Sequence, residues 1–153
     1  MAVTMSGEFV LPADKATVWA KLNDADTLKA SIPGCESLEK LSDTEMQAVV
    51  KVKIGPVSAR FKGRVNLTDI DAPNSYRIAG QGEGGVAGFA KGGANVRLTD
   101  ADGGGTKLGY DVDAQVGGKI AQLGSRLIDG VAKKMSDAFF SNFAKAVGGQ
   151  SGG

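Results

Sequence analysis

The spacing of apolar residues near the end of the chain predicts its longest element. Between Gly117 and Val147 no proline occurs, and apolar residues recur every three or four positions, which is the period of one helix face. They are Ile120, Leu123, Leu127, Val131, Met135, Phe139 and Phe143. A helix from Lys119 to Val147 measures about 43 Å at 1.5 Å per residue, against a radius of gyration of roughly 15 Å for a domain of this size. We therefore expect one long amphipathic helix that crosses the whole domain and is closed by Gly148-Gly149.

From Glu36 onward the period is two, which is typical of half-buried antiparallel strands. The strands expected there include residues 45–54, 57–67, 76–84, 87–100 and 106–116. Upstream, residues 6–11 are predicted to form a strand, and residues 15–22 and 25–31 two short helices, the first capped by Asp14. This order predicts an α+β fold, in which a curved antiparallel sheet of six to seven strands wraps around the C-terminal helix. The two short helices should pack against the far end of that helix.

The inner face of the predicted sheet carries many small residues. They are Ala48, Ala59, Gly63, Gly80, Gly82, Gly84, Ala90, Gly92, Ala94 and Ala114. Larger side chains between them, Met46, Phe61, Tyr76, Phe89 and Tyr110, can roof a space instead of filling it. An empty apolar cavity of about 300 Å³ would cost on the order of 7 kcal/mol, so water or a ligand should occupy it. The alternative is that the glycines mark bulges in a strongly curled sheet, or that Gly124 and Gly130 let the helix pack closely.

If the interior is hollow, we expect the residues around it to bind an apolar ligand. They are Met46, Val50, Phe61, Gly82, Phe89, Ala90, Gly92, Ala94, Tyr110, Ala114, Leu123, Leu127 and Val131. The pocket mouth is expected at Ile54, Gly55, Pro56, Gly84 and Gly85, where the glycine-rich hairpin of residues 84–92 would face a turn, with Phe89 as a gate. The alternative is a simple flexible hairpin.

The amino-acid composition excludes several classes of catalytic and metal-binding site. The chain has no histidine and one cysteine, Cys35, which excludes Ser-His-Asp triads, Cys-His dyads and zinc sites, so we expect no metal and no cofactor. The series Gly80-x-Gly82-x-Gly84 lacks the following helix and the acidic partner of a dinucleotide site. The formal net charge of +1 gives no general attraction to nucleic acid. We expect one domain over residues 1–147 and a flexible glycine-rich end at residues 148–153.

The N-terminus and the apolar runs predict where the protein resides. No basic segment precedes a long apolar run at the N-terminus, and no apolar run approaches the roughly 18 residues needed to span a bilayer, so we expect a cytoplasmic protein.

Basic residues gather on the outer face of two adjacent strands: Lys51, Lys53, Arg60, Lys62 and Arg64. A solvated face is the default interpretation, and contact with an acidic partner or an anionic lipid surface is the alternative. Trp19 is expected in the core, and Cys35 as a buried structural thiol.

Five ordered blocks of the sequence resemble a known family. They are Leu11-Pro12-Ala13 with Val18-Trp19 and Leu22, Ile32-Pro33-Gly34-Cys35-Glu36, Lys53-Ile54-Gly55-Pro56, Gly84 to Gly92, and Val116 to Ile128. Over about residues 6–147 the chain closely resembles the G-subunit family of carbon monoxide dehydrogenase. The resemblance implies the helix-grip fold of the START-related polyketide cyclase and lipid-transport (SRPBCC) superfamily. It also implies an accessory role beside molybdenum hydroxylases, without molybdopterin, flavin or iron-sulfur clusters. Many relatives continue into a proline-rich tail that ends in a membrane-seeking segment, whereas this sequence stops at Gly153. The resemblance therefore keeps peripheral contact with the inner membrane face only as an alternative to a purely cytoplasmic location.

Three functions follow as hypotheses. The first is a non-enzymatic accessory protein that binds a hydrophobic small molecule, such as a quinone or lipid, and aids a molybdenum hydroxylase in assembly, membrane association or electron delivery. The second is a cyclase-like or hydrolase-like enzyme of the same superfamily, with Glu83, Asp111, Asp113 or Tyr110 as acid or base. The third is an interaction module with a filled core. Two carboxylates that converge inside the pocket would favour the enzyme.

Overall fold

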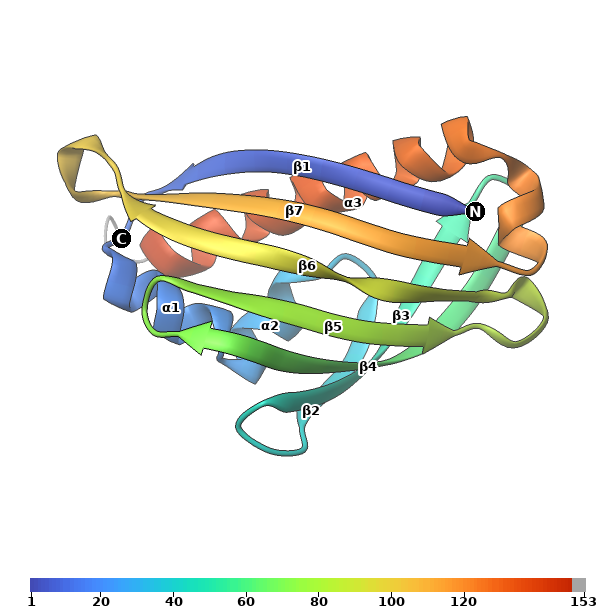
Figure 1. Ribbon diagram of the computed structural model, residues 1–153, viewed down its shortest axis with the longest axis horizontal. Coiled ribbons are helices and arrows are strands. Elements are labelled where there is room, and N and C mark those ends of the chain that lie inside the picture. The colour runs from blue at the N-terminus through green and yellow to red at the C-terminus, as the bar shows by residue number, and fades with distance from the viewer. Residues whose placement is uncertain (150–153) are drawn as a thin grey trace.

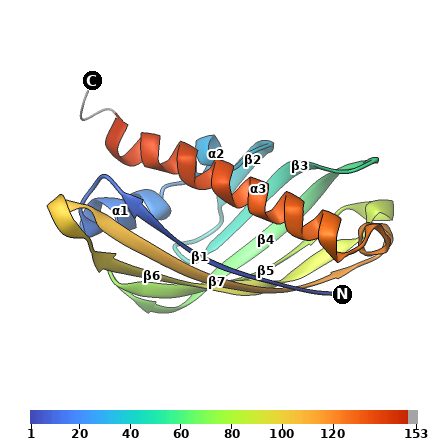
Figure 2. The ribbon, with the colours of Figure 1, turned by 90° about the horizontal axis from the view of Figure 1, so that it is seen from above.

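Seven antiparallel strands form one curved sheet, and the C-terminal helix lies along its concave side (Figure 2). The computed structural model describes residues 1–149. The strands are β1 (Ala2–Leu11), β2 (Cys35–Lys40), β3 (Glu45–Ile54), β4 (Val57–Asp71), β5 (Ser75–Glu83), β6 (Phe89–Asp100) and β7 (Thr106–Gly117). Their order across the sheet is β1-β7-β6-β5-β4-β3-β2, so consecutive strands from β2 to β7 are neighbours (Figure 1). The predicted meander and the α+β class are confirmed.

Two short helices follow β1, as predicted: α1 (Lys15–Leu22) and α2 (Ala25–Ser31). Asp14 caps α1 by accepting a hydrogen bond from the Thr17 backbone N–H at 2.8 Å, because the first N–H groups of a helix have no partner within it. Asp24 caps α2 in the same way through Thr27, at 3.0 Å. The pair packs against the far end of the C-terminal helix, where the Asn142 side chain donates to the Ser31 carbonyl at 3.1 Å.

The C-terminal helix is shorter than predicted. After β7 the chain forms a 3-10 turn, η3 (Lys119–Leu123), and the α-helix α3 (Ser125–Ala144) begins only after Gly124. The backbone of Gly118 has φ +82° and that of Gly124 φ +94°, a region that glycine adopts readily and that no continuous helix contains. A 20-residue helix is about 30 Å long instead of about 43 Å. The expectation of one helix from Lys119 to Val147 is therefore wrong at its N-terminal end.

The end of the chain continues α3 as a π-type turn, η4 (Lys145–Gly149). The flexible end expected at residues 148–153 falls mostly on residues 150–153, which lie outside the described residues. The sequence also suggests that Gly130 favours close packing of the helix. A Cβ built at Gly130 would meet no atom within 4 Å, so helix packing does not require a glycine there.

Two hydrophobic clusters fill the space between sheet and helix. At the α1 end, the ring of Phe140 stacks against Phe9, at 4.2 Å between centroids, and against Tyr110, at 5.4 Å. At the opposite end, η3 folds back under the sheet and places Ile120, which is 4% exposed, against Ile54 and Ile128. The interior is thus packed at both ends. A free volume remains between the two clusters, between the sheet and the helices.

Candidate functional site

An apolar cavity of about 360 Å³ lies between the concave face of β2 to β7 and the helices α1, α2 and α3. Its lining residues are Leu22, Leu28, Ile32, Leu38, Met46, Gln47, Ala48, Val50, Phe61, Gly63, Val65, Leu67, Tyr76, Ile78, Val96, Leu108 and Phe139. The period-two alternation of β3 and β4 turns one face of each strand inward, and the pairing of Ala48 with Gly63 places two small residues side by side in this wall. The α1–α2 pair provides Leu22, Leu28 and Ile32 on the opposite wall.

Only two residues of this lining, Gln47 and Tyr76, carry a polar side chain. Gln47 is half-buried, whereas Tyr76 is 6% exposed. The Tyr76 ring is held by Trp19, whose ring meets it at 90° with 5.3 Å between centroids. Burial raises the pKa of the Tyr76 hydroxyl well above its usual range, so the group is a neutral phenol. Trp19 thus has the packing role that was predicted for it.

The structure places three of the predicted ligand-binding residues, Met46, Val50 and Phe61, in the lining of the cavity. The cavity walls are mainly large aliphatic side chains, and of the small inner residues only Ala48 and Gly63 border it. Small residues on the sheet therefore did not by themselves locate the free volume.

Five predicted small residues lie on the concave face by their register but do not line the cavity: Gly82, Ala90, Gly92, Ala94 and Ala114. A Cβ on Gly92 would clash with the Asp113 carbonyl oxygen, because β6 and β7 approach closely in the curled sheet. At Gly84 a Cβ would meet the Phe61 ring at 2.7 Å. At Gly84 and Gly92 the glycines therefore allow a neighbouring ring or strand to approach closely. This role differs from both predicted ones, a lining of the pocket and a bulge or close helix packing.

Phe89 does not lie in the pocket or gate it. It is 44% exposed and pairs in register with Gly117, and its ring takes the space where a Gly117 Cβ would stand. Tyr110 is also outside the cavity, since it fills the aromatic cluster and its hydroxyl lies 2.9 Å from Ser136 Oγ. The remaining predicted residues, Leu123, Leu127 and Val131, belong to η3 and the first half of α3 and line a shallow surface groove.

The predicted mouth is closed. Ile54 is 8% exposed inside the second hydrophobic cluster, and a Cβ on Gly55 would stand 2.9 Å from Leu127 Cδ2. None of Ile54, Gly55, Pro56, Gly84 and Gly85 borders the cavity. The reason is η3, which was expected to be helix and instead tucks Ile120 beneath this end of the sheet.

Fourteen lining residues were not among the predicted ligand-binding residues, although Ala48, Gly63 and Tyr76 were expected on the inner face of the sheet. They are Leu22, Leu28, Ile32, Leu38, Gln47, Ala48, Gly63, Val65, Leu67, Tyr76, Ile78, Val96, Leu108 and Phe139. The first short helix carried a usable signal, because Val18 and Leu22 lie four residues apart on one apolar face. The position of α2 relative to the sheet had no signal in the sequence.

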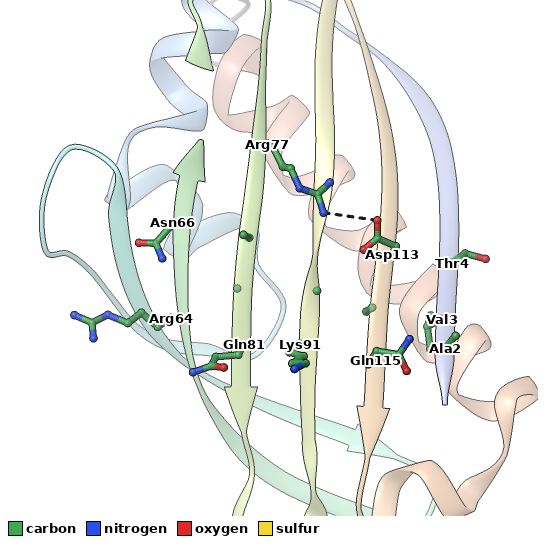
Figure 3. Close-up of a pocket in the computed structure, with 14 residues that line it drawn as sticks. Ala2, Val3, Thr4, Arg64, Asn66, Arg77, Gln81, Lys91, Asp113 and Gln115 are labelled. Carbon is green, nitrogen blue, oxygen red and sulfur yellow. Dashed lines mark ion pairs between the residues drawn. The ribbon is translucent and has the colours of Figure 1, made fainter. Parts of the chain in front are cut away.

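A larger hollow, about 610 Å³, lies on the outer face of the sheet (Figure 3). Arg64, Gln81, Lys91 and Gln115 point outward around it, and Arg77 reaches from β5 to Asp113 on β7, with 3.7 Å between nitrogen and oxygen. Gly92 and Ala114, predicted for the inner pocket, border this outer hollow. Its polar, charged rim suits water and hydrophilic groups and not an apolar molecule.

The carboxylates considered as catalytic groups lie outside the cavity. Asp111 pairs with Arg97 at 2.8 Å on the outer face, and Glu83 is exposed. The Cys35 thiol is half-buried and donates to the Ser37 carbonyl at 3.3 Å, and burial raises its pKa. In residues 1–149 no group of three or more histidine, cysteine, aspartate or glutamate residues is placed to hold a metal ion. No helix in this part of the chain is both long and apolar enough to cross a membrane.

Comparisons with known proteins agree on family and fold. The family model for the G-subunit of carbon monoxide dehydrogenase (CoxG) matches residues 7–148. A conserved protein from Geobacillus kaustophilus is 33% identical, with 95% of each chain covered and a TM-score of 0.88. A START superfamily protein from Mycobacterium smegmatis is 14% identical, covers 94% of this chain and 96% of its own, and has a TM-score of 0.70. The Zhui aromatase/cyclase from Streptomyces sp. R1128 is 14% identical, with 96% and 94% covered and a TM-score of 0.69. The last two likenesses show the helix-grip fold. Among curated protein sequences nothing matches.

Proposed function

Because this chain belongs to the CoxG family, the G-subunit family of carbon monoxide dehydrogenase, we propose that it is a non-enzymatic accessory protein that holds a hydrophobic small molecule in the cavity of about 360 Å³. The ligand class is an apolar molecule such as a quinone or a lipid. The protein that it serves is a molybdenum hydroxylase, in assembly, membrane association or electron delivery. The apolar cavity is the observation that carries this proposal.

The energetics of the cavity support an occupant. At about 24 cal/mol per Å³, a dry and empty volume of about 360 Å³ costs on the order of 9 kcal/mol. A typical domain has a net stability of only about 5 to 15 kcal/mol. An apolar guest restores the missing contacts, and the volume, at the small end of ligand sites, suits a ring system or a short alkyl chain. A longer isoprenoid tail would extend beyond the cavity.

The distribution of charge favours a carrier over an enzyme. Among residues 1–149 no acidic or basic side chain lines the cavity, so within this part of the chain no general acid or base faces a bound molecule except the neutral phenol of Tyr76. Asp111 and Asp113 form ion pairs with Arg97 and Arg77, respectively, on the outer face of the sheet. The aromatase/cyclase that shares the fold therefore supports the architecture of this chain and not its chemistry.

The test combines native mass spectrometry with thermal unfolding in the presence of a naphthoquinone that carries one prenyl unit. At a ligand concentration of 100 Kd the protein gains about 2.7 kcal/mol, which raises the Tm by roughly 5 to 10 °C. Ala48→Leu, which places a larger side chain in the cavity wall, should abolish the shift. Ala30→Leu on the exposed side of α2 should keep it and is the matched control.

Two results would contradict the proposal. One is that neither this quinone nor a monoacylglycerol raises the Tm or remains bound in native mass spectra. The other is that Ala48→Leu binds as tightly as the wild-type chain, which would place the ligand elsewhere. The partner is tested separately by co-purification with molybdenum hydroxylase subunits. If these subunits are retained by Ala48→Leu while ligand binding is lost, the two roles use different surfaces.

A further inference from the structure

Among the described residues, Tyr76 is the one deeply buried polar side chain that borders the cavity. It stands near the start of β5 and is 6% exposed, and Trp19 holds its ring edge-on at 5.3 Å. The ring has little freedom to turn its hydroxyl away, because packed side chains occupy rotamer minima in a dense interior. The direction of this hydroxyl is therefore a fixed feature of the site.

The Tyr76 hydroxyl has no hydrogen-bond partner within residues 1–149. The other tyrosine of the chain, Tyr110, has such a partner, since its hydroxyl lies 2.9 Å from Ser136 Oγ. Every side-chain nitrogen and oxygen of the described residues that is fully removed from solvent has a partner. The unpartnered hydroxyl must therefore border open space, and the open space that Tyr76 lines is the cavity.

A hydroxyl that faces an apolar cavity without a protein partner is unfavourable unless water or a ligand bonds to it, and phenylalanine at this position would avoid that cost. We propose that the cavity takes a neutral apolar molecule that carries a carbonyl oxygen, and that this oxygen accepts a hydrogen bond from the Tyr76 hydroxyl. This inference rests on the proposed function and specifies its ligand class: a ketone or quinone carbonyl on a hydrophobic frame.

The rest of the lining disfavours a charged group inside the cavity. Within residues 1–149 no lysine or arginine borders the cavity, so a carboxylate or phosphate group placed beside Tyr76 would lack a counter-charge. Because burial keeps the Tyr76 phenol protonated, with its pKa raised, it acts as a donor over the whole physiological range. Gln47, the other polar lining residue, is half-buried and has access to water at the edge of the site.

The experiment uses two probes of nearly the same shape, 2-acetylnaphthalene with a ketone and 2-ethylnaphthalene without one. Calorimetric titration of the wild-type chain should give tighter binding of the ketone. Tyr76→Phe should weaken ketone binding by about 5- to 20-fold, the effect of one lost hydrogen bond in a buried site, and leave the hydrocarbon unchanged. Tyr110→Phe removes the other tyrosine hydroxyl and should change neither affinity, which makes it the matched control.

Infrared spectroscopy of the bound ketone supplies a second readout. Its carbonyl stretch should move to lower frequency in the wild-type complex and not in the Tyr76→Phe complex. If the wild-type chain binds both probes equally and without this shift, the inference is overturned while the proposed carrier function stands. If neither probe binds to the wild-type chain, the carrier function fails first and the inference fails with it.

Discussion

Trp19 and Tyr76 meet at a right angle, with 5.3 Å between ring centroids, and this contact joins α1 to the sheet at the wall of the cavity. Edge-to-face pairs of aromatic rings add roughly 0.5 to 1.5 kcal/mol beyond the area that they bury. The contact therefore stabilises the protein and also orients Tyr76, a deeply buried polar side chain that borders the ligand site.

We expect Trp19→Ala to destabilise the protein by about 2 to 4 kcal/mol, because it removes a half-buried ring and its edge contact with Tyr76. Trp19→Phe keeps an aromatic edge and should cost less than half of that. Urea unfolding followed by circular dichroism gives both values. Equal stability of the alanine variant and the wild-type chain would show that the Trp19–Tyr76 contact does not stabilise the protein.

Two glycines near the start of α3 should respond in opposite ways to alanine. Gly124 has φ +94° and ψ 153°, so Gly124→Ala should destabilise the protein by about 1 to 3 kcal/mol. Gly130 lies within α3 with no atom near its missing side chain, so Gly130→Ala should stabilise it by about 0.5 to 1 kcal/mol. Thermal unfolding of both variants is the measurement. If both stabilised the protein, the helix would run unbroken through Gly124 and the corrected helix start would be wrong.

Helix capping predicts a loss of stability in acid. The Asp24 carboxylate accepts hydrogen bonds from the Thr27 side chain and backbone, which lowers its pKa below the ordinary 3.8. Because the folded pKa is the lower one, this contribution is present above the unfolded pKa and is lost as the pH falls through the folded pKa. Urea midpoints measured between about pH 5 and pH 2 should fall less steeply for Asp24→Asn, which keeps a capping oxygen but does not titrate. Identical slopes for the two proteins would show that Asp24 does not contribute to the loss of stability in acid.

Alanine variants of Phe89 and Phe61 should distinguish a ligand bound in the cavity from a ligand bound on the outer face of the sheet. Phe89→Ala should change stability by no more than about 0.5 kcal/mol and leave ligand affinity unaltered, because the ring lies outside the cavity and is 44% exposed. Phe61→Ala removes part of the cavity wall and should cost about 2 to 4 kcal/mol and weaken binding. Titration of both variants with 2-acetylnaphthalene is the check. Weaker binding to Phe89→Ala with normal binding to Phe61→Ala would mean that the site was placed on the wrong face.

The elements that the sequence predicts well are those defined by local chemistry. The helices α1 and α2 and the strand β3 have the predicted bounds, since aspartate caps and a clear period of two or 3.6 fix them without tertiary information. The start of α3 could not be predicted in this way. The apolar spacing continues through Ile120 and Leu123, although Gly118 and Gly124 adopt positive φ, and hydrophobic period does not report backbone conformation.

That one error explains the misplaced mouth. The prediction placed helix where η3 lies, and η3 packs Ile120 against Ile54 and closes that end of the sheet. The period did identify the inner face, and Met46, Val50 and Phe61 line the cavity as predicted. Whether an inner glycine faces a void or a neighbour depends on contacts such as that of Gly84 with the Phe61 ring, which only the folded structure contains.

The most direct test of the ligand site is a crystal structure of the protein grown with the prenylated naphthoquinone. We predict electron density for the ring system between Leu28, Met46 and Tyr76, with a quinone oxygen about 2.7 Å from the Tyr76 hydroxyl. A cavity filled by the protein's own side chains, with the quinone absent or bound only on the outer face, would contradict the account.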